Sequence, residues 1–394
     1  MAREAVIVDC ARTAFGKRKG ALAGWHPTDL LGLVLRTIVE RNDIDPARID
    51  DVVGGCVTQS GEQGCNVTRN AWVAGGLPWT VPATSVDRQC GSSQQAAHFV
   101  AQGVIAGAYD IGIACGVESM TRAPMSSNAR GGTGPFSGEF LAQTDNTLGI
   151  QFWVAQVLAD KWGITREEMD AYSLQSHQRA AANTDNGFFA GEIVPVPIVD
   201  PETGARTGEM LETDEGIRRD ATLDKIAARP AAWESADQPA PDITAANSSQ
   251  MTDGAAAMII ASADFAEQHG LPVRARFRHF AVAAEDPVLV LSAPVPVTYK
   301  LMERSGMSID DFDAVECNEA FAAIALMWQK EFGYPMDRFN PRGGAIALGH
   351  PLGASGVALM TRLLRHLEDT GGRFGFQTMC EGGGQANATV IERV

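Results

Sequence analysis

The chain has 394 residues, of which 45% are hydrophobic and 20% charged, and its formal net charge is −16. These fractions are typical of globular proteins, and the length predicts two or three domain-sized units. The acidic balance argues against nonspecific nucleic-acid binding, which needs a basic face, and no apolar run reaches the length of a membrane span. The N-terminal residues lack the hydrophobic region of a signal peptide, so we expect a cytoplasmic protein.

Seven cysteines are widely spaced along the chain: Cys10, Cys56, Cys65, Cys90, Cys115, Cys317 and Cys380. An odd number without a secretion signal predicts free thiols rather than a disulfide framework. The sequence contains no CxxC or HExxH motif, so we expect no metal site.

Strands and helices are predicted to alternate along the first 118 residues. We expect strands at 5–9, 49–53, 84–86 and 110–115, and helices at 28–40, 67–74 and 91–105. Beyond residue 118 the character changes, with helices predicted at 151–162 and 166–184 and a polar, irregular stretch at 200–241. Thr165 opens the second of these helices with a capping box. A regular strand is predicted at 252–261.

The second half repeats the order of the first. Residues 49–53 resemble residues 312–316, Cys90 has its counterpart in His350, and Cys115 has its counterpart in Cys380. The shared offset of about 260 residues predicts a duplicated α/β fold with mostly parallel sheets covered on both faces. Ligands of such folds bind at the carboxyl ends of strands. Cys90, His350, Cys380 and Asn318 are all predicted to lie there.

The stretch Gly343–Gly356 contains five glycines and one histidine. Glycine permits close backbone approaches that other residues do not, and His350 can exchange a proton near neutral pH. This density favours a loop that brings its backbone close to a ligand. A Gly-rich turn with a surface histidine remains the alternative.

Cys90 is followed by Gly-Ser-Ser at a predicted helix N-terminus, which favours the thiolate and offers backbone N–H groups to an oxyanion. Cys380 stands one residue before three glycines, and Asn318 stands at a strand-to-helix junction. The structural alternatives are a buried thiol, a flexible turn and a helix cap. Together with His350 these residues favour covalent thioester chemistry. A cysteine protease also uses Cys, His and Asn, but it gives no reason for the second Gly-flanked cysteine.

The chain resembles the thiolase family along essentially its whole length. The resemblance rests on residues 87–96, 243–257, 318–321, 343–356 and 380–384. It implies a duplicated thiolase fold of five αβαβα layers, with two mixed, mostly parallel sheets. It also implies an N-terminal half at 1–118 plus 251–270, an inserted loop domain at 119–250 that covers coenzyme A, and a C-terminal half at 271–394.

The resemblance further implies roles for the catalytic residues. Cys90 would take the acyl group, and His350 would activate it. His350 and a water held by Asn318 would line one oxyanion hole, and the N–H groups of Cys90 and Gly382 would form the other. Cys380 would carry the proton at the α-carbon of the acetyl unit.

The remaining implied residues concern binding. Ser249 would contact the pantetheine, Arg218 or Arg219 would approach the nucleotide, and Phe321 would belong to the substrate site. Coenzyme A is expected as a co-substrate, with no tightly bound cofactor. Acyl-CoA thioesters are the expected partners, and the family implies a homodimer or homotetramer.

One departure concerns the substrate. Thiolases acting on acetoacetyl-CoA carry a Met-Gly-x-Thr-Ala-Glu pattern where this chain has Gln151-Phe-Trp-Val-Ala-Gln156. The segments around Cys90 and Glu381 are similar to those of actinobacterial thiolases of sterol degradation. We therefore expect a 3-ketoacyl-CoA thiolase of fatty-acid or steroid β-oxidation that yields acetyl-CoA and a shortened acyl-CoA. The alternatives are an acetoacetyl-CoA thiolase working in the condensing direction and a noncatalytic, thiolase-like lipid-binding protein.

Overall fold

The computed structural model describes residues 3–234 and 241–394. Its strands are β1 (Ala5–Thr13), β2 (Gly16–Lys17), β3 (Asp51–Gly55), β4 (Ala83–Val86), β5 (Ile111–Ser119), β6 (Ile193–Val194), β7 (Val196–Val199), β8 (Arg206–Leu211), β9 (Thr252–Ser262), β10 (Ala275–Ala284), β11 (Ala314–Cys317), β12 (Phe374–Glu381) and β13 (Gln385–Arg393). Its α-helices are α1 (Pro27–Glu40), α2 (Val67–Ala74), α3 (Ser92–Ile105), α4 (Gly138–Gln143), α5 (Gln151–Lys161), α6 (Arg166–Asp185), α7 (Leu223–Ala227), α8 (Ala263–Gln268), α9 (Pro294–Ser305), α10 (Ala322–Phe332), α11 (Ala345–Leu348) and α12 (Leu352–Thr370). None of the helices in these described ranges combines the length and the hydropathy that a membrane crossing needs.

The two halves repeat one strand arrangement, which confirms the predicted duplication. The first half has the order β3-β5-β9-β1, and the second has the order β11-β12-β13-β10. In each half the first pair of strands is parallel, and the next two pairs are antiparallel. β4 adds a further parallel strand at the outer edge of the first half. The thiolase architecture inferred from the sequence therefore rests on a real internal symmetry.

The predicted predominance of parallel strands is wrong in detail. Along the described sheet, the pairs of β9 with β1 and β5, and of β13 with β10 and β12, are all antiparallel. The two sheets are also joined edge to edge, because β1 pairs with β10 at Val6↔Arg276 and Ile7↔Ala275. Buried strands of either direction have the same continuous apolar pattern, so the sequence could not distinguish them.

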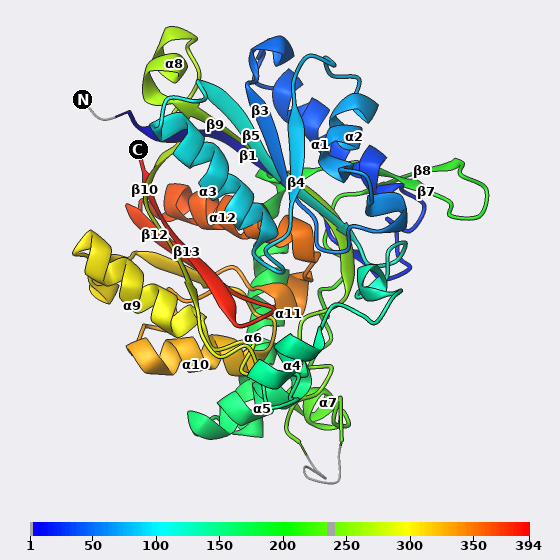
Figure 1. Cartoon of the computed structure of the whole chain (residues 1–394), viewed down its shortest axis with the longest axis vertical. Helices are drawn as coiled ribbons and strands as arrows, with labels where there is room; N and C mark the ends of the chain where they lie inside the picture. The colour runs from blue at the N-terminus through cyan, green and yellow to red at the C-terminus, as the bar shows by residue number, and fades with distance from the viewer. Residues whose placement is uncertain (1–2, 235–240) are drawn as a thin grey trace.

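The helices complete the layers (Figure 1). α3 and α12 pack against each other between the two halves of the sheet, and α1 and α9 cover the outer faces. The burial patterns agree with this placement, because α3 buries 10 of its 14 residues and α12 buries 14 of its 19, whereas α9 buries 4 of its 12. The N-termini of both central helices therefore lie inside the molecule. Cys90 comes just before α3, and His350 comes just before α12.

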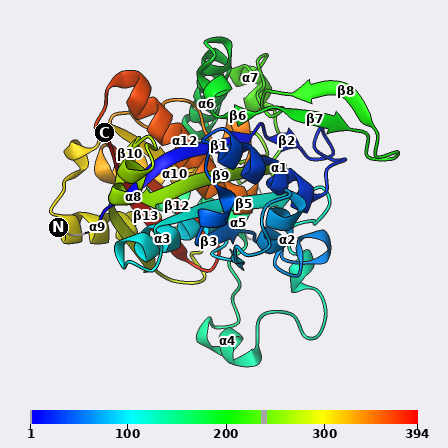
Figure 2. The same ribbon diagram turned by 90° about the horizontal axis from the view of Figure 1, so that it is seen from above.

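The segment between β5 and β9 carries helices α4 to α7, of which α5 and α6 contribute buried residues to the core. The β7–β8 hairpin and α4 extend from the body of the molecule (Figure 2). Thr165 caps α6 through the predicted capping box. The stretch 200–241 is less irregular than predicted, since it contains β8 and α7, while residues 235–240 lie outside the described ranges.

A buried ion cluster joins the segment between β5 and β9 to β1, which is longer than predicted. Arg12 is completely buried and donates to Glu192 at 2.6 Å and to Asp214 at 2.6 Å and 2.9 Å. The predicted strand ends at residue 9, whereas β1 continues through Arg12 to Thr13. The partners that make the burial of Arg12 tolerable come from residues far along the chain, so local pattern could not reveal them.

Candidate active site

Cys90 lies in the turn that leads into α3, as predicted. The Ser92 hydroxyl closes this turn by donating to Gln89 O at 2.6 Å and accepting from the Arg88 N–H at 2.9 Å. Gln89 itself has a φ of 47°, in the left-handed region that non-glycine residues seldom adopt. Strain of this kind persists where the surroundings enforce it, which is frequent at active sites.

The expected effect of the helix on the Cys90 thiol is outweighed by burial. Cys90 is only 6% exposed, and burial followed by the charge of Glu381 raises its pKa to about 12. The backbone N–H groups of Cys90 and Gly382 face the sulfur and act in the opposite direction. The resting group is therefore a thiol, and it needs a base before it can attack a carbonyl.

His350 is held by two hydrogen bonds in the buried loop before α12. Its Nε2 lies 3.2 Å from Asn318 Nδ2, and its Nδ1 lies 2.6 Å from Ser355 Oγ. The Ser355 hydroxyl donates its single proton to Pro351 O at 2.8 Å, so it accepts from His350 Nδ1. Nε2 then carries the lone pair that accepts from Asn318. Burial lowers the pKa of His350 to about 4, which keeps the imidazole neutral and available as a base.

The glycines of the 343–356 stretch let the two central helices meet at their N-termini. A Cβ on Gly356 would lie 2.1 Å from the backbone N of Gln94, and one on Gly353 would lie 2.5 Å from Val117 O. The Val357 N–H donates to Ser93 Oγ at 3.0 Å across this contact. These glycines therefore permit a close approach between two protein segments, and larger side chains at the two positions would separate them. The predicted approach of the loop to a ligand stays a prediction.

Cys380 is buried at the end of β12, on the second half's counterpart of β5. Burial raises its pKa well above the ordinary value, and Cys90, Cys317 and Glu381 are the next causes in order. Cys90 is thus a neighbour of Cys380 in space, although 290 positions separate them in the numbering. Both thiols and the Gly382 N–H belong to one buried cluster.

Two buried carboxyl groups that the sequence did not single out organise the surrounding loops. Glu118 accepts hydrogen bonds from Val57 N, Thr58 N, Gln63 Nε2 and Gly353 N, at 2.8 to 3.0 Å. Glu319 accepts from Tyr172 Oη, Ser176 Oγ, Asn340 Nδ2 and Ile346 N, at 2.7 to 3.3 Å. Glu118 joins the loop after β3 to α12, and Glu319 joins α6 to the 343–356 stretch. Glu319 followed Asn318 in a motif, whereas Glu118 gave no local signal beyond its position at a strand end.

The residues expected to bind coenzyme A occupy different environments. Ser249 N donates to Ala320 O at 2.9 Å, which places Ser249 beside the start of α10. The Arg219 side chain pairs with Asp185 at 2.8 Å, whereas among the described residues no ion pair involves the Arg218 side chain. Phe321 is 4% exposed and meets Phe152 of α5 edge to face, with 5.5 Å between ring centroids.

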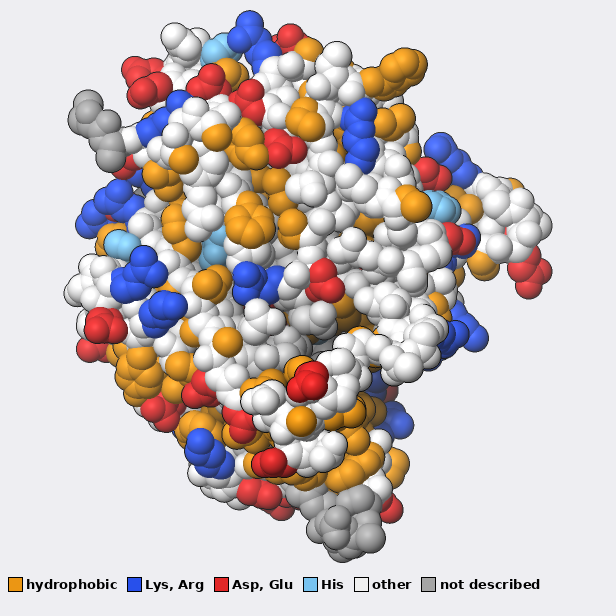
Figure 3. Space-filling view, viewed as in Figure 1, with side chains coloured by type: hydrophobic (Ala, Val, Ile, Leu, Met, Phe, Trp, Pro, Cys, Tyr) orange, Lys and Arg blue, Asp and Glu red, His pale blue; other side chains and the backbone are white. Residues whose placement is uncertain are grey.

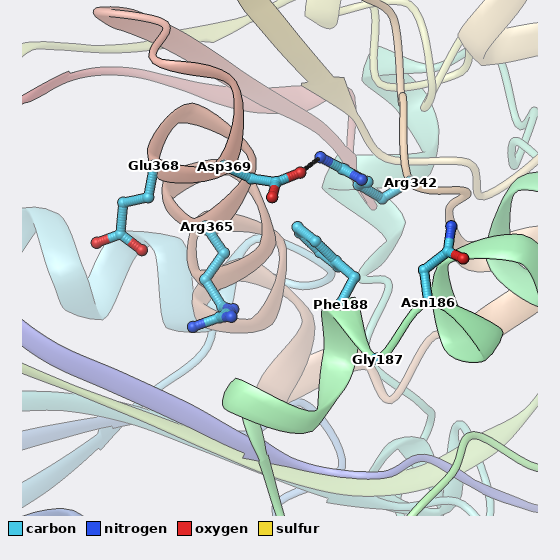
Figure 4. A pocket seen from close by; sticks show the side chains of 7 residues that line it. All are labelled: Asn186, Gly187, Phe188, Arg342, Arg365, Glu368 and Asp369. Carbon is cyan, nitrogen blue, oxygen red and sulfur yellow. Dashed lines mark hydrogen bonds and ion pairs between the residues drawn. The ribbon is translucent and has the colours of Figure 1, made fainter.

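A cleft away from the cysteines lies at the C-terminal end of α12, whereas His350 lies just before its N-terminal end. It is lined by Asn186, Gly187, Phe188, Arg342, Arg365, Glu368 and Asp369 (Figure 4). The axis of α12 spans about 28 Å, so this cleft is far from His350. Arg342 pairs with Asp369 there, and its guanidinium lies 4.1 Å from the centre of the Phe188 ring.

On the face of the molecule shown in Figure 3, acidic and basic side chains are interspersed.

Comparison with known proteins agrees with the fold. The thiolase N-terminal domain matches residues 5–264, and the thiolase C-terminal domain matches residues 271–393. The chain therefore belongs to the thiolase family and is an acyltransferase. It is 46% identical to the steroid 3-ketoacyl-CoA thiolase FadA6 of Mycobacterium tuberculosis, over 99% of this chain and 94% of that protein.

Two further relatives define the range of the similarity. A 3-ketoacyl-CoA thiolase of Aliivibrio fischeri is 41% identical over 99% of this chain and 100% of that protein. The crystal structure of the Bacillus anthracis acetyl-CoA acetyltransferase superposes with a TM-score of 0.89 at 30% identity, covering 100% of this chain and 99% of that one. The shared architecture thus extends to thiolases with different names, and the substrate must be argued from this chain's own residues.

Proposed function

We propose that this protein is a 3-ketoacyl-CoA thiolase that cleaves a 3-oxoacyl-CoA with free coenzyme A, through an acyl group on Cys90. The single observation that carries the proposal is the convergence of the Cys380 thiol and the Gly382 N–H on the Cys90 sulfur. A nucleophile, an acid and an oxyanion donor in one buried cluster are what carbon–carbon thiolysis requires.

In the first step His350 Nε2 takes the proton of the Cys90 thiol, and the sulfur attacks the 3-keto carbon. In the resting structure Nε2 is engaged by Asn318, so Asn318 must release it before the transfer. The N–H groups of Cys90 and Gly382 stabilise the resulting oxyanion.

In the second step the bond between C2 and C3 breaks, and its electron pair passes to the acetyl-CoA enolate. The Cys380 thiol donates its proton to C2 and becomes a thiolate. Asn318 Oδ1 has no hydrogen-bond partner among the described residues, which supports the proposal that it holds the water at the second oxyanion hole. Free coenzyme A then gives its thiol proton to Cys380 and takes the acyl group from Cys90, and His350 returns the proton to Cys90.

We propose a bulky acyl group rather than the four-carbon one. Phe152 lies in the segment 151–156, which departs from the Met-Gly-x-Thr-Ala-Glu pattern of thiolases acting on acetoacetyl-CoA. It packs on Phe321 at the N-terminus of α10, and 37% of its surface stays exposed. The relative named as a steroid 3-ketoacyl-CoA thiolase supports the same choice. The proposal also includes residues 119–250 as the domain that covers coenzyme A, with Ser249 and Arg218 as contacts and Arg219 held by Asp185.

The decisive experiment measures thiolysis of acetoacetyl-CoA, a long-chain 3-oxoacyl-CoA and a polycyclic 3-oxoacyl-CoA by the same preparation. Intact-protein mass spectrometry before addition of coenzyme A reports which acyl group remains on Cys90. Activity confined to acetoacetyl-CoA would establish the condensing-type alternative. Absence of both turnover and acylation with every substrate would favour the noncatalytic lipid-binding alternative.

Two further expectations remain predictions about the assembly and its place in the cell. We propose a homodimer or homotetramer, since β4 is an edge strand and the nearby Trp79 is 81% exposed. Light scattering of the purified protein measures the state directly. The cytoplasmic location expected from the sequence is tested by cell fractionation.

A further inference from the structure

Two buried side chains beside the nucleophile carry oxygen atoms that the proposed reaction does not use. Glu381 and Asn387 lie on β12 and β13, and both are fully buried. Neither of the two Glu381 oxygens has a hydrogen-bond partner among the described residues, and the Asn387 Oδ1 has none there either. A buried acceptor left without a donor costs about 1–3 kcal/mol, so such groups call for an explanation.

The oxygens of these two side chains converge on Gly91, the residue that follows Cys90. A Cβ on Gly91 would lie 1.9 Å from Glu381 Oε1 and 2.4 Å from Asn387 Oδ1. The Asn387 amide nitrogen points instead at Gly91 O, 3.5 Å away. Two buried acceptors therefore lie next to the same face of Gly91, and a proton on the Glu381 carboxyl would supply the hydrogen-bond donor that this place lacks.

The charged and titratable groups around Glu381 leave its carboxyl without a direct cation. Arg88 of the turn before α3 donates to Gln385 Oε1 at 3.0 Å. Its charge and, after it, the nearby backbone N–H of Asn387 lower the pKa of Glu381, but they offset the burial of the carboxyl only in part. Asp87 of the same turn adds a negative charge. Cys90 and Cys380 are the remaining titratable neighbours. β13 contributes the uncharged side chains Gln385 and Asn387.

We infer that Glu381 is a positioning residue for the nucleophile and works in its acid form, with its carboxyl proton donated to Asn387 Oδ1. In this form it braces the Gly91 turn and places no negative charge beside Cys90. The inference rests on the proposed function only in taking Cys90 as the nucleophile.

The sign of the resulting pH dependence follows from the carboxyl. Burial raises the pKa of Glu381 to about 8, so the acid form prevails below that pH and the carboxylate above it. The carboxylate opposes ionisation of the Cys90 thiol, for which Glu381 is the largest cause after burial. The reactivity of Cys90 should thus rise less steeply above pH 8 than it does for an isolated thiol.

The test is the rate of Cys90 alkylation by iodoacetamide from pH 6 to 10, measured by peptide mass spectrometry, which requires no turnover. The variants are Glu381→Gln, which keeps a neutral donor, and the control Glu303→Gln, on an exposed position of α9. We expect Glu381→Gln to match the wild type within about twofold at pH 6.5 and to react about fivefold faster at pH 9. The control should follow the wild type throughout.

Two outcomes overturn the inference. One is a Glu381→Gln profile that superposes on the wild type at every pH, and the other is a uniform loss at every pH, which a merely structural role would produce. A second variant, Asn387→Leu, removes the acceptor and should move the flattening of the wild-type profile to lower pH. An unmoved profile in that variant would contradict the shared proton. Alkylation can succeed when thiolysis fails, so the two proposals are judged separately.

Discussion

The two halves of the fold end their equivalent strands β5 and β12 with a buried glutamate, and these two glutamates are treated differently. Glu118 near the end of β5 accepts four hydrogen bonds that join three segments. Glu381 at the end of β12 accepts none from the described residues and has no cation bound to it. The same backbone frame thus supports a satisfied carboxyl in one half and a proton-holding one in the other.

The proposed chemistry is divided between the halves in the same way. The first half supplies Cys90, and the second supplies His350, Asn318 and Cys380, so neither copy holds a complete site. Duplication provided two strand ends and two helix N-termini that point inward, and divergence of the loops gave each a different function. Substitutions at matched positions should therefore have unequal effects.

The largest expected effect is at the nucleophile. We expect Cys90→Ser to lower kcat/KM for thiolysis by at least about 10³-fold, because a serine hydroxyl is a far weaker nucleophile than a thiol. Steady-state thiolysis of the preferred 3-oxoacyl-CoA measures this.

Cys115→Ser is the matched control, since Cys115 is a buried thiol on β5 that has no part in the proposed reaction. It should retain most of the activity per folded molecule. Equal activity of Cys90→Ser and the wild type would refute the catalytic assignment.

The next effect concerns the satisfied glutamate. Glu118→Gln places an amide NH₂ among four donors, and we expect a loss of about 2–4 kcal/mol in the free energy of unfolding. Urea denaturation at pH 7 measures it. A change of less than about 0.5 kcal/mol would mean that the four hydrogen bonds do not hold the loops together.

Replacement of the unsatisfied Glu381 should instead favour the variant's stability over that of the wild type as the pH rises. The pKa of Glu381 is about 8 in the folded chain and 4.5 as its ordinary value, so the folded state binds the extra proton. Wild-type stability relative to Glu381→Gln is therefore highest below pH 4.5 and declines as the pH rises to 8. We expect the Tm difference between variant and wild type to shift in favour of the variant by on the order of a few °C between pH 5 and 8.

Thermal unfolding at both pH values measures this shift, and Glu303→Gln again serves as the control. A Tm difference that does not change with pH would show that Glu381 titrates normally.

The smallest effect is expected at the partner of the base. Ser355→Ala removes the acceptor of the His350 Nδ1 proton, and the imidazole can then present the wrong tautomer. We expect kcat to fall about fivefold with KM for coenzyme A unchanged. A rise in KM with kcat unchanged would place Ser355 in binding rather than in orientation.

Much of the frame followed from local pattern. α2 begins and ends at the predicted residues, and the capping box at Thr165 opens α6 as expected. The turn before α3 and the glycine-rich approach to α12 were identified because unusual residues cluster there. Strand direction, the β1–β10 junction and the extension of β1 through Arg12 were missed, since each depends on partners distant in sequence.

The sequence by itself determined the duplicated order of elements and the four residues that carry the proposed chemistry, because motifs and an internal offset are properties of one dimension. Only the tertiary structure decided their protonation. Burial raises the pKa of the Cys90 thiol to about 12 and lowers that of His350 to about 4. It also isolates Glu381 beside Gly91. Desolvation and the convergence of distant side chains exist only once the chain is folded, so no reading of local pattern could supply them.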